Sequence, residues 1–102
     1  MSVLQANQSN FEKEVLQSQL PVLVDFYTTW CGPCRQLSPI IEEISKNTKG
    51  FKVAKINIEE EAELAARYHI MSVPTLIVFK DGREANKVVG VVTKEQIMNM
   101  LV

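Results

Sequence analysis

Two cysteines separated by two residues, Cys31 and Cys34, are the side chains of this 102-residue sequence best suited to chemistry. An apolar run at 22–27 precedes them and an amphipathic run follows, which predicts a strand, a short turn and a helix that begins near Cys31. Residues three apart at the start of a helix lie on one face, with Cα atoms roughly 5–6 Å apart, which is within the range that a disulfide needs. We therefore expect the pair to cycle between dithiol and disulfide with little movement of the backbone.

The N-terminus of a helix also favours an anion, and a thiolate at Cys31 would be such an anion. Two other interpretations of the pair stay open. A structural zinc site usually needs four ligands, and beyond the two thiols the chain offers His69 as its single histidine. A purely structural disulfide across so short a loop would constrain the unfolded chain little. The position of the pair after a strand and at a helix start favours redox chemistry.

Asp25 interrupts the apolar strand that leads to the cysteines. A buried carboxylate without a partner is costly, and burial raises its pKa. Either Asp25 faces solvent or an ion pair, or it is a buried proton acceptor that reaches Cys34. Lys55, on the next predicted strand, is a candidate partner for Asp25, although a surface lysine that covers apolar groups with its stem would give the same pattern.

Composition and charge limit the classes of protein to which the chain can belong. Hydrophobic residues make up 46% of it and charged residues 23%, and the net charge is −1, so we expect a single soluble domain over 1–102 that binds neither nucleic acid nor membrane. No apolar run approaches the roughly 20 residues of a membrane span. Residues 1–10 are polar and lack the core of a signal peptide. We expect a cytoplasmic protein, and a mature organelle protein would look the same.

The alternation of apolar runs predicts the order βαβαβαββα, with a parallel part first, an antiparallel hairpin last and helices on both faces. Ser9 with Glu12, and Thr93 with Gln96, have the spacing of a capping box. Asp81-Gly82 is a typical hairpin turn. We expect strands at 3–4, 22–28, 51–58, 75–79 and 87–92. We expect helices at 10–18, at 31–47 with a kink at Pro39 and with Gly50 closing it, after 59–61, and after Thr93.

Taken together, these segments resemble the thioredoxin family over essentially the whole chain. The resemblance implies an α/β thioredoxin fold, in which a central mixed five-stranded sheet carries helices on both faces. The pattern around the cysteines is highly specific, because an Asp-bearing strand precedes Trp-Cys-Gly-Pro-Cys and a Pro-Thr follows about forty residues later. The segments that carry the resemblance are Val22-Leu23-Val24-Asp25-Phe26, Trp30-Cys31-Gly32-Pro33-Cys34, Pro39, Lys55-Ile56-Asn57, Ser72-Val73-Pro74-Thr75-Leu76, Lys80-Asp81-Gly82 and Val89-Gly90.

The resemblance also implies a role for each residue of the site. Cys31 would be the attacking thiolate and Cys34 the resolving thiol. Asp25, acting through water and coupled to Lys55, would be the proton acceptor for Cys34. A proline that begins a strand can be cis or trans, and the resemblance implies that Pro74 is cis. A substrate-binding rim would lie around the pair, with the backbone of Val73 pairing with an extended substrate segment; its members would be Trp30, Gly32, Pro33, Ile58, Val73, Pro74 and Gly90.

The function that the resemblance implies is that of a general protein-disulfide reductase. Gly32 and Pro33 place no ionisable side chain between the cysteines, and family members with this dipeptide are generally reductants. The chain has no dinucleotide-binding fingerprint, so we expect no bound cofactor, and recycling by a separate thioredoxin reductase that is NADPH- or ferredoxin-dependent. Because two thiols and one histidine are too few for a usual zinc site, we also expect no metal. Its other partners would be disulfide-containing target proteins, and we expect a monomer.

Two other functions stay open for this sequence. One is a redox-inactive docking or processivity subunit that uses the same fold as a rigid module. The other is an oxidase or isomerase of the same fold, which the redox potential of the cysteine pair would separate from a reductase. The chain also departs from the common family pattern, and these departures leave its partner preference open; they stand at Tyr27, Thr28, Thr29, Ala62 and His69.

Overall fold

The computed structural model describes residues 3–47 and 49–102. Its elements follow the predicted order, and most of their ends agree with the prediction to within two residues. The strands are β1 (Leu4–Gln5), β2 (Val22–Tyr27), β3 (Lys52–Asn57), β4 (Thr75–Lys80) and β5 (Arg83–Val89). The helices are the π-helical turn η1 (Glu12–Leu16) and the α-helices α1 (Gly32–Lys46), α2 (Ala62–Arg67) and α3 (Lys94–Met100).

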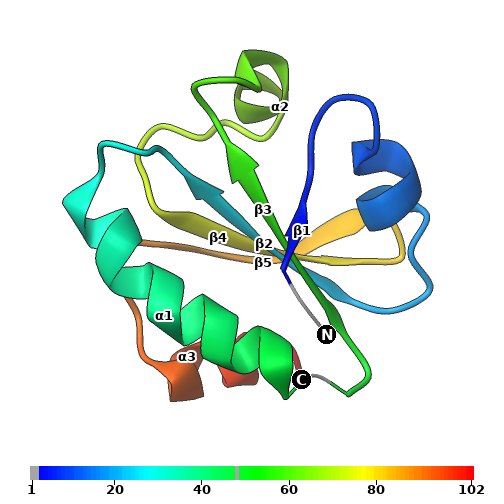
Figure 1. Ribbon diagram of the computed structural model, residues 1–102. Coiled ribbons are helices and arrows are strands. Elements are labelled where there is room, and N and C mark those ends of the chain that lie inside the picture. Colours follow the sequence, from blue (N-terminus) through cyan, green and yellow to red (C-terminus); the bar gives the residue numbers. More distant parts are fainter. Residues whose placement is uncertain (1–2, 48) are drawn as a thin grey trace.

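The described strands form a five-stranded sheet in the order β1-β3-β2-β4-β5. β1 and β2 run parallel to β3, whereas β4 runs antiparallel to both β2 and β5. Figure 1 shows α1 and α3 on one side of this sheet and η1 on the other. The predicted fold class, a mixed five-stranded sheet with helices on both faces, is confirmed.

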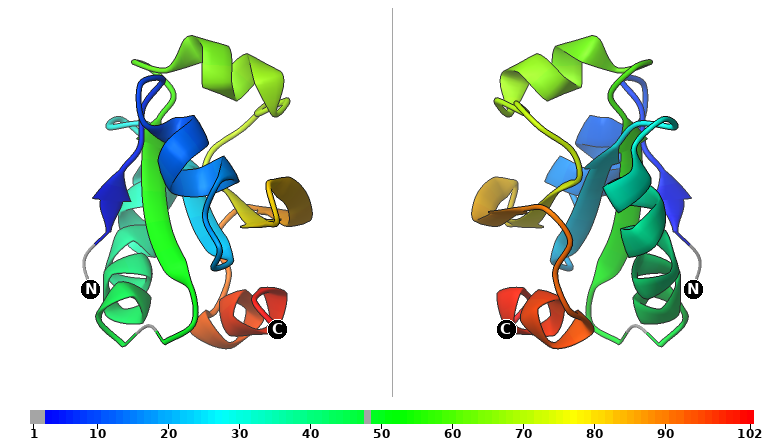
Figure 2. Two further views of the ribbon diagram at one scale, coloured as in Figure 1. Left: turned by 90° about the vertical axis from the view of Figure 1, so that its right-hand side faces the viewer. Right: turned by 90° about the vertical axis from the view of Figure 1, so that its left-hand side faces the viewer.

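Alternate residues of β2 point to opposite faces of the sheet, as the two-residue period of a strand requires. Val22, Val24 and Phe26 join an apolar cluster under η1 and α2, which we call the aromatic face because the rings of Phe11, Tyr68 and Phe79 meet there. Leu23 joins a second apolar cluster under α1 and α3. The two faces and their helices can be followed in the side views of Figure 2. Asp25 and Tyr27 therefore lie on the α1 face.

The capping box predicted at Ser9 and Glu12 is wrong. The Asn7 side chain caps this turn instead, because its Oδ1 accepts hydrogen bonds from the backbone N–H groups of Ser9 at 2.9 Å and Asn10 at 3.0 Å. The turn that follows is π-helical, with the Gln17 N–H donating to the Glu12 carbonyl at 2.8 Å. An asparagine just before a helix offers the same kind of acceptor as a serine, and here the Asn7 Oδ1 accepts the hydrogen bonds.

The capping box predicted at Thr93 and Gln96 is confirmed. The Gln96 N–H donates to Thr93 Oγ1 at 3.1 Å, and the Thr93 N–H donates to Gln96 Oε1 at 2.9 Å. The two bonds fix the start of α3, which packs Ile97 into the cluster under α1.

The last strand differs from its prediction at 87–92, because β5 begins at Arg83 and ends at Val89. Asp81 and Gly82, both with positive φ (53° and 77°), form a tight turn that leads directly from β4 into β5. The strand lies at the outer edge of the sheet and is mostly exposed, so its first residues are polar and do not alternate. Its register with β4 shifts between Val78 and Phe79, which leaves Ala85 without a partner there.

Two helix ends depend on special backbone positions. α1 ends at Lys46 with Asn47 as its C-cap, one residue from the predicted end, and Gly50 adopts a positive φ of 86° in the turn before β3. Thr48, between them, lies outside the described residues. His69, one of the departures from the common family pattern, follows α2 with a φ of 55°, in the left-handed region that favours glycine. In the described part of the chain, no helix is long and apolar enough to cross a membrane.

Candidate functional site

The two cysteines are joined by a disulfide at the N-terminus of α1, as their spacing predicts. Their Cα atoms are 5.2 Å apart. Cys31 is the N-cap residue of the helix, and its Sγ accepts a hydrogen bond from the backbone N–H of Cys34 at 3.1 Å. Helix N–H groups that point at this sulfur would also stabilise its thiolate after reduction.

The two sulfur-bearing residues differ in their access to solvent. Cys31 is half-buried, whereas the side chain of Cys34 lies against the protein and the residue is only 4% exposed. A group that approaches from solvent therefore meets Cys31 first. Trp30, the residue before it, is 82% exposed, and Gly32 and Pro33 are also exposed.

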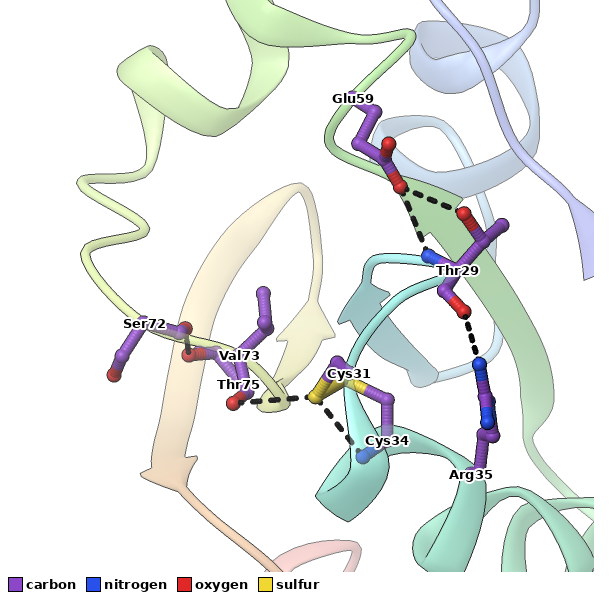
Figure 3. The surroundings of a disulfide bond; sticks show 8 residues. All are labelled: Thr29, Cys31, Cys34, Arg35, Glu59, Ser72, Val73 and Thr75. Atoms are coloured by element: carbon purple, nitrogen blue, oxygen red, sulfur yellow. Dashed lines mark hydrogen bonds between the residues drawn. A yellow bond between two sulfur atoms is a disulfide. The ribbon is translucent and has the colours of Figure 1, made fainter.

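The segment before β4 lies beside the disulfide although it is about forty residues away in sequence. The Cys31 Sγ lies 3.7 Å from the carbonyl oxygen of Val73 (Figure 3). The Val73–Pro74 peptide bond is cis, which confirms the prediction for Pro74. The Gly90 N–H donates to the Pro74 carbonyl at 2.8 Å, so the end of β5 holds this segment from the other side.

The structure thus brings most of the predicted rim together around the disulfide. Val73 and Gly90 are half-buried, and Pro74 is buried. Ile58 follows β3 at the same end of the sheet and is half-buried against the apolar core, with its N–H bonded to the Tyr27 carbonyl at 3.0 Å. None of these residues carries a charged side chain.

Asp25 is buried, as its position in the strand predicts. It is 5% exposed, and its Oδ1 has no hydrogen-bond partner in the described part of the protein. Lys55 on β3 is the residue opposite Asp25 in the register of β2 and β3. Burial raises the pKa of Asp25 to about 7, and the positive charge of Lys55 opposes part of that rise. A carboxyl group with such a pKa can take up or release a proton near neutral pH.

A cavity connects Asp25 with the inner cysteine. Its volume is about 200 Å³, which is room for several water molecules. Asp25 and Cys34 both line it, so a proton could pass between carboxylate and sulfur through water. The remaining lining residues are Tyr27, Thr28, Thr29, Arg35, Ser38 and Lys55.

The family model for thioredoxin matches residues 2–102. The chain belongs to the thioredoxin family. A thioredoxin of Rickettsia felis is 48% identical over 94 residues, which cover 91% of this chain and 90% of that protein. A thioredoxin 1 of Nostoc sp. is 45% identical over 98 residues, which cover 95% and 92% of the two chains. The solved structure of a mutant thioredoxin from Halobacterium salinarum has a TM-score of 0.90 and 34% identity, with 98% of this chain and 88% of that chain covered.

Membership of the thioredoxin family, together with the Cys31–Cys34 disulfide, identifies the chain as a thiol–disulfide oxidoreductase with protein-disulfide reductase activity. Its partners are, in general terms, disulfide-containing proteins and a reductase that returns electrons to the pair. Among residues 3–47 and 49–102, no three His, Cys, Asp or Glu side chains come together as a metal site would require.

Sequence reasoning missed a group that supports the loop before Cys31 in this thioredoxin-family chain. The Glu59 carboxylate accepts hydrogen bonds from the Thr29 N–H at 2.9 Å and from Thr29 Oγ1 at 3.0 Å. Arg35 donates to the Thr29 carbonyl at 3.2 Å (Figure 3). The one signal in the sequence was position, since Arg35 directly follows Cys34 and Glu59 stands soon after the end of an apolar strand.

Tyr27 is a second residue whose contacts sequence reasoning did not find. Its ring lies under the Lys55 ammonium, and its hydroxyl is hydrogen-bonded to Gln5 of β1. The sequence indicated that Tyr27 departs from the usual pattern of the thioredoxin family, but it did not indicate that Lys55 and Gln5 contact it.

Proposed function

We propose that Cys31 is the nucleophile and Cys34 the resolving thiol of a two-step exchange that reduces disulfides in target proteins. The observation that carries these assignments is the difference in access between the two residues. Cys31 is half-buried at the helix N-terminus, whereas Cys34 is only 4% exposed and faces the cavity. An incoming disulfide reaches Cys31, and Cys34 is held three residues further along the same helix.

The exchange conserves atoms and electrons. The Cys31 thiolate attacks one sulfur of the substrate disulfide, forms a mixed disulfide and releases the other substrate sulfur as a thiolate. Cys34 loses its proton, and its thiolate attacks the Cys31 sulfur. The Cys31–Cys34 disulfide forms and the second substrate sulfur leaves. The substrate gains two electrons, and the dithiol of the protein loses two.

Asp25 is the proton acceptor for Cys34 in the second step. Its buried carboxyl group shares a cavity with Cys34, and its pKa of about 7 suits transfer near neutral pH. Lys55 tunes this group, because its positive charge favours the carboxylate and opposes the effect of burial.

The substrate docks on the surface around Cys31 as an extended segment. Its backbone pairs with that of Val73, whose carbonyl oxygen lies 3.7 Å from the Cys31 Sγ. The exposed ring of Trp30 covers the substrate on one side, and the remaining surface offers little charge for which a partner would have to compensate. The residues of this docking surface are Trp30, Gly32, Pro33, Ile58, Val73, Pro74 and Gly90.

The oxidised pair is returned to the dithiol by a thioredoxin reductase that is NADPH- or ferredoxin-dependent, in the cytoplasm. The sequence supports a separate electron donor because it has no G-x-G-x-x-G fingerprint for a dinucleotide. Reduction of a disulfide-bearing protein with each reductase in turn distinguishes the two donors. A cysteine pair more oxidising than the glutathione pool would instead favour an oxidase or isomerase.

Exchange of each cysteine for serine tests the assignment of the two thiols. We expect Cys31→Ser to abolish turnover, and Cys34→Ser to accumulate mixed disulfides with substrate that non-reducing electrophoresis and mass spectrometry detect. Covalent complexes with Cys31→Ser and none with Cys34→Ser would reverse the two roles. A double serine variant that keeps the cellular function of the chain would point to a docking subunit.

A further inference from the structure

Three strands place Gln5, Lys55 and Asp25 side by side across the sheet. Gln5 on β1 pairs in register with Lys55 on β3, which pairs in register with Asp25 on β2. Tyr27 lies two residues after Asp25, on the same face of the sheet. Its hydroxyl reaches across β3 to Gln5, accepting a hydrogen bond from Nε2 at 3.2 Å and donating to Oε1 at 3.4 Å. The bridge between Tyr27 and Gln5 therefore spans the strand that carries Lys55.

The Lys55 ammonium lies over the ring of Tyr27 rather than in an ion pair. Its Nζ lies 5.6 Å from the centroid of the Tyr27 ring, which is within the range of a cation–π contact. Within the described part of the chain, ion pairs join Lys52 to Glu14 and Lys94 to Glu43, and none joins Lys55 to Asp25.

Lys55 is the charged group that matters most for Asp25, because the other groups around Asp25 are apolar or bound elsewhere. β4 places the apolar Leu76 opposite Asp25. From α1, Cys34 and Arg35 line the cavity, and the Arg35 guanidinium is bound to the Thr29 carbonyl. Lys55 is the cation whose field lowers the pKa of Asp25. The position of its flexible four-carbon side chain therefore decides how strongly Asp25 is affected.

We propose that Tyr27 is a positioning residue whose aromatic face, anchored by Gln5, holds the Lys55 ammonium beside Asp25 and keeps it from extending into solvent. The effect on turnover rests on the proposed role of Asp25 as proton acceptor. A lysine side chain without such a contact extends its charged end into water. Its field at Asp25 would then weaken through distance and solvent screening.

Substitution of Tyr27 should therefore act on Asp25 in the same direction as substitution of Lys55. In Tyr27→Leu we expect the pKa of Asp25 to rise by about half a pH unit, a factor of about three in proton affinity. Lys55→Gln should raise it further, because the charge itself is lost. Tyr27→Phe keeps the ring face and is the matched control, with most of the wild-type value retained. Gln5→Ala, an exposed change, should give a smaller rise.

The measurement is a carbon-13 NMR titration of the Asp25 carboxyl group in the oxidised protein, in which the two cysteines do not titrate. The proton spectrum of each variant reports whether it is folded, and Gln5→Ala tests the bridge if Tyr27→Leu does not fold. The decisive variant combines Tyr27→Leu with Lys55→Gln. We expect the pKa of Asp25 to be the same in this double variant as in Lys55→Gln alone.

Three results would overturn the proposal: a fall in the pKa of Asp25 in Tyr27→Leu, no change in it, or an equal rise in the presence and absence of Lys55. A fall would mean that the ring acts by keeping water from Asp25. The rate of mixed-disulfide resolution against pH is measured on the same variants. If the NMR pKa moves as expected and this pH profile does not follow it, positioning of Lys55 stands and the proposed role of Asp25 fails.

Discussion

The two faces of the sheet are built from the same strands, and they differ in what they bury. On the aromatic face, Val22, Val24 and Phe26 pack with the rings of Phe11 and Phe79. On the α1 face, apolar residues fill the part under α1 and α3, whereas the end near the disulfide holds Asp25, Lys55 and a cavity. The aromatic face is an apolar core, and the α1 face contains a polar cavity beside a reactive sulfur.

The difference shows how a small domain keeps a destabilising group. Burial of the Asp25 carboxyl group, with no partner for Oδ1 among the described residues, opposes folding. Because adjacent residues of a strand face opposite ways, the neighbours Val24 and Phe26 still contribute fully to the aromatic face. The comparison predicts that changes on the aromatic face lower stability and leave the rate per folded molecule unchanged. It also predicts that removal of the buried carboxyl group near the disulfide slows the reaction and raises stability.

Phe79→Ala should have the largest effect on stability. Phe79 is 1% exposed, and its ring packs against those of Phe11 and Tyr68. We expect the free energy of unfolding to fall by about 3–5 kcal/mol, the usual range for a buried phenylalanine. Urea denaturation measures this loss. The rate is measured under conditions where the variant remains folded. A reductase rate per molecule well below that of the wild type would contradict the prediction that the aromatic face contributes to stability and not to the rate.

Asp25→Asn should change stability in the opposite direction. A carboxyl group whose pKa is about 7 in the folded protein and 3.8 in the unfolded chain favours folding most below pH 4. This stability is lost as the pH rises toward 7 and the folded state must give up its proton. At pH 7 we expect the variant to be more stable than the wild type by about 3–4 kcal/mol, with resolution of the mixed disulfide about a hundredfold slower.

The dependence on pH gives this second prediction its control. The stability difference between Asp25→Asn and the wild type should shrink toward zero near pH 4, where the folded carboxyl group is neutral like the amide. Glu84→Gln removes an exposed carboxylate on β5 and should change stability little at either pH. Thermal unfolding across this range, with single-turnover reduction at each pH, measures both quantities. A constant stability difference would contradict the raised pKa of Asp25.

Thr93→Ala should have the smallest effect. It tests whether the part of the α1 face under α3 contributes to stability alone, unlike the end near the disulfide. Thr93 caps α3 through the Gln96 N–H at 3.1 Å, and it does not line the cavity. We expect a loss of about 1 kcal/mol in the free energy of unfolding, typical of a lost N-cap. Thermal unfolding measures it, and Thr93→Ser, which keeps the hydroxyl, is the matched control. A change in the rate of disulfide reduction would show that α3 takes part in the chemistry.

Much of the fold could be predicted because the strong signals in this sequence are local. The β2 run, the Thr93 capping box and the Asp81-Gly82 turn each fix their element through neighbouring residues. The start of β5 was not predicted, because an exposed edge strand tolerates polar side chains on both faces. Arg83 to Lys87 therefore show no alternation. The helix at 10–18 was predicted, but the cap of η1 was not, because Asn7 and Ser9 offer equivalent acceptors and only the folded backbone decides between them.

The candidate site divides in the same way. Its reactive pair and buried acid follow from residue types and spacing, and the thioredoxin resemblance implied the cis bond before Pro74. The contacts of Tyr27 with Gln5, and of Thr29 with Glu59, join residues 22 and 30 positions apart. Such pairs depend on which strands become neighbours and in which register. The sequence around one residue of a pair does not indicate the other.

The outer strand β5 has a consequence for the protein in a crowded cell. An open sheet edge is a template on which strands of other chains can grow into aggregates, and β5 is such an edge. Arg83, Glu84 and Lys87 place charge along it, and the shift of register at Ala85 breaks the regular row of donors and acceptors. A protein that reduces disulfide-containing proteins is thus protected against pairing with their strands along this edge.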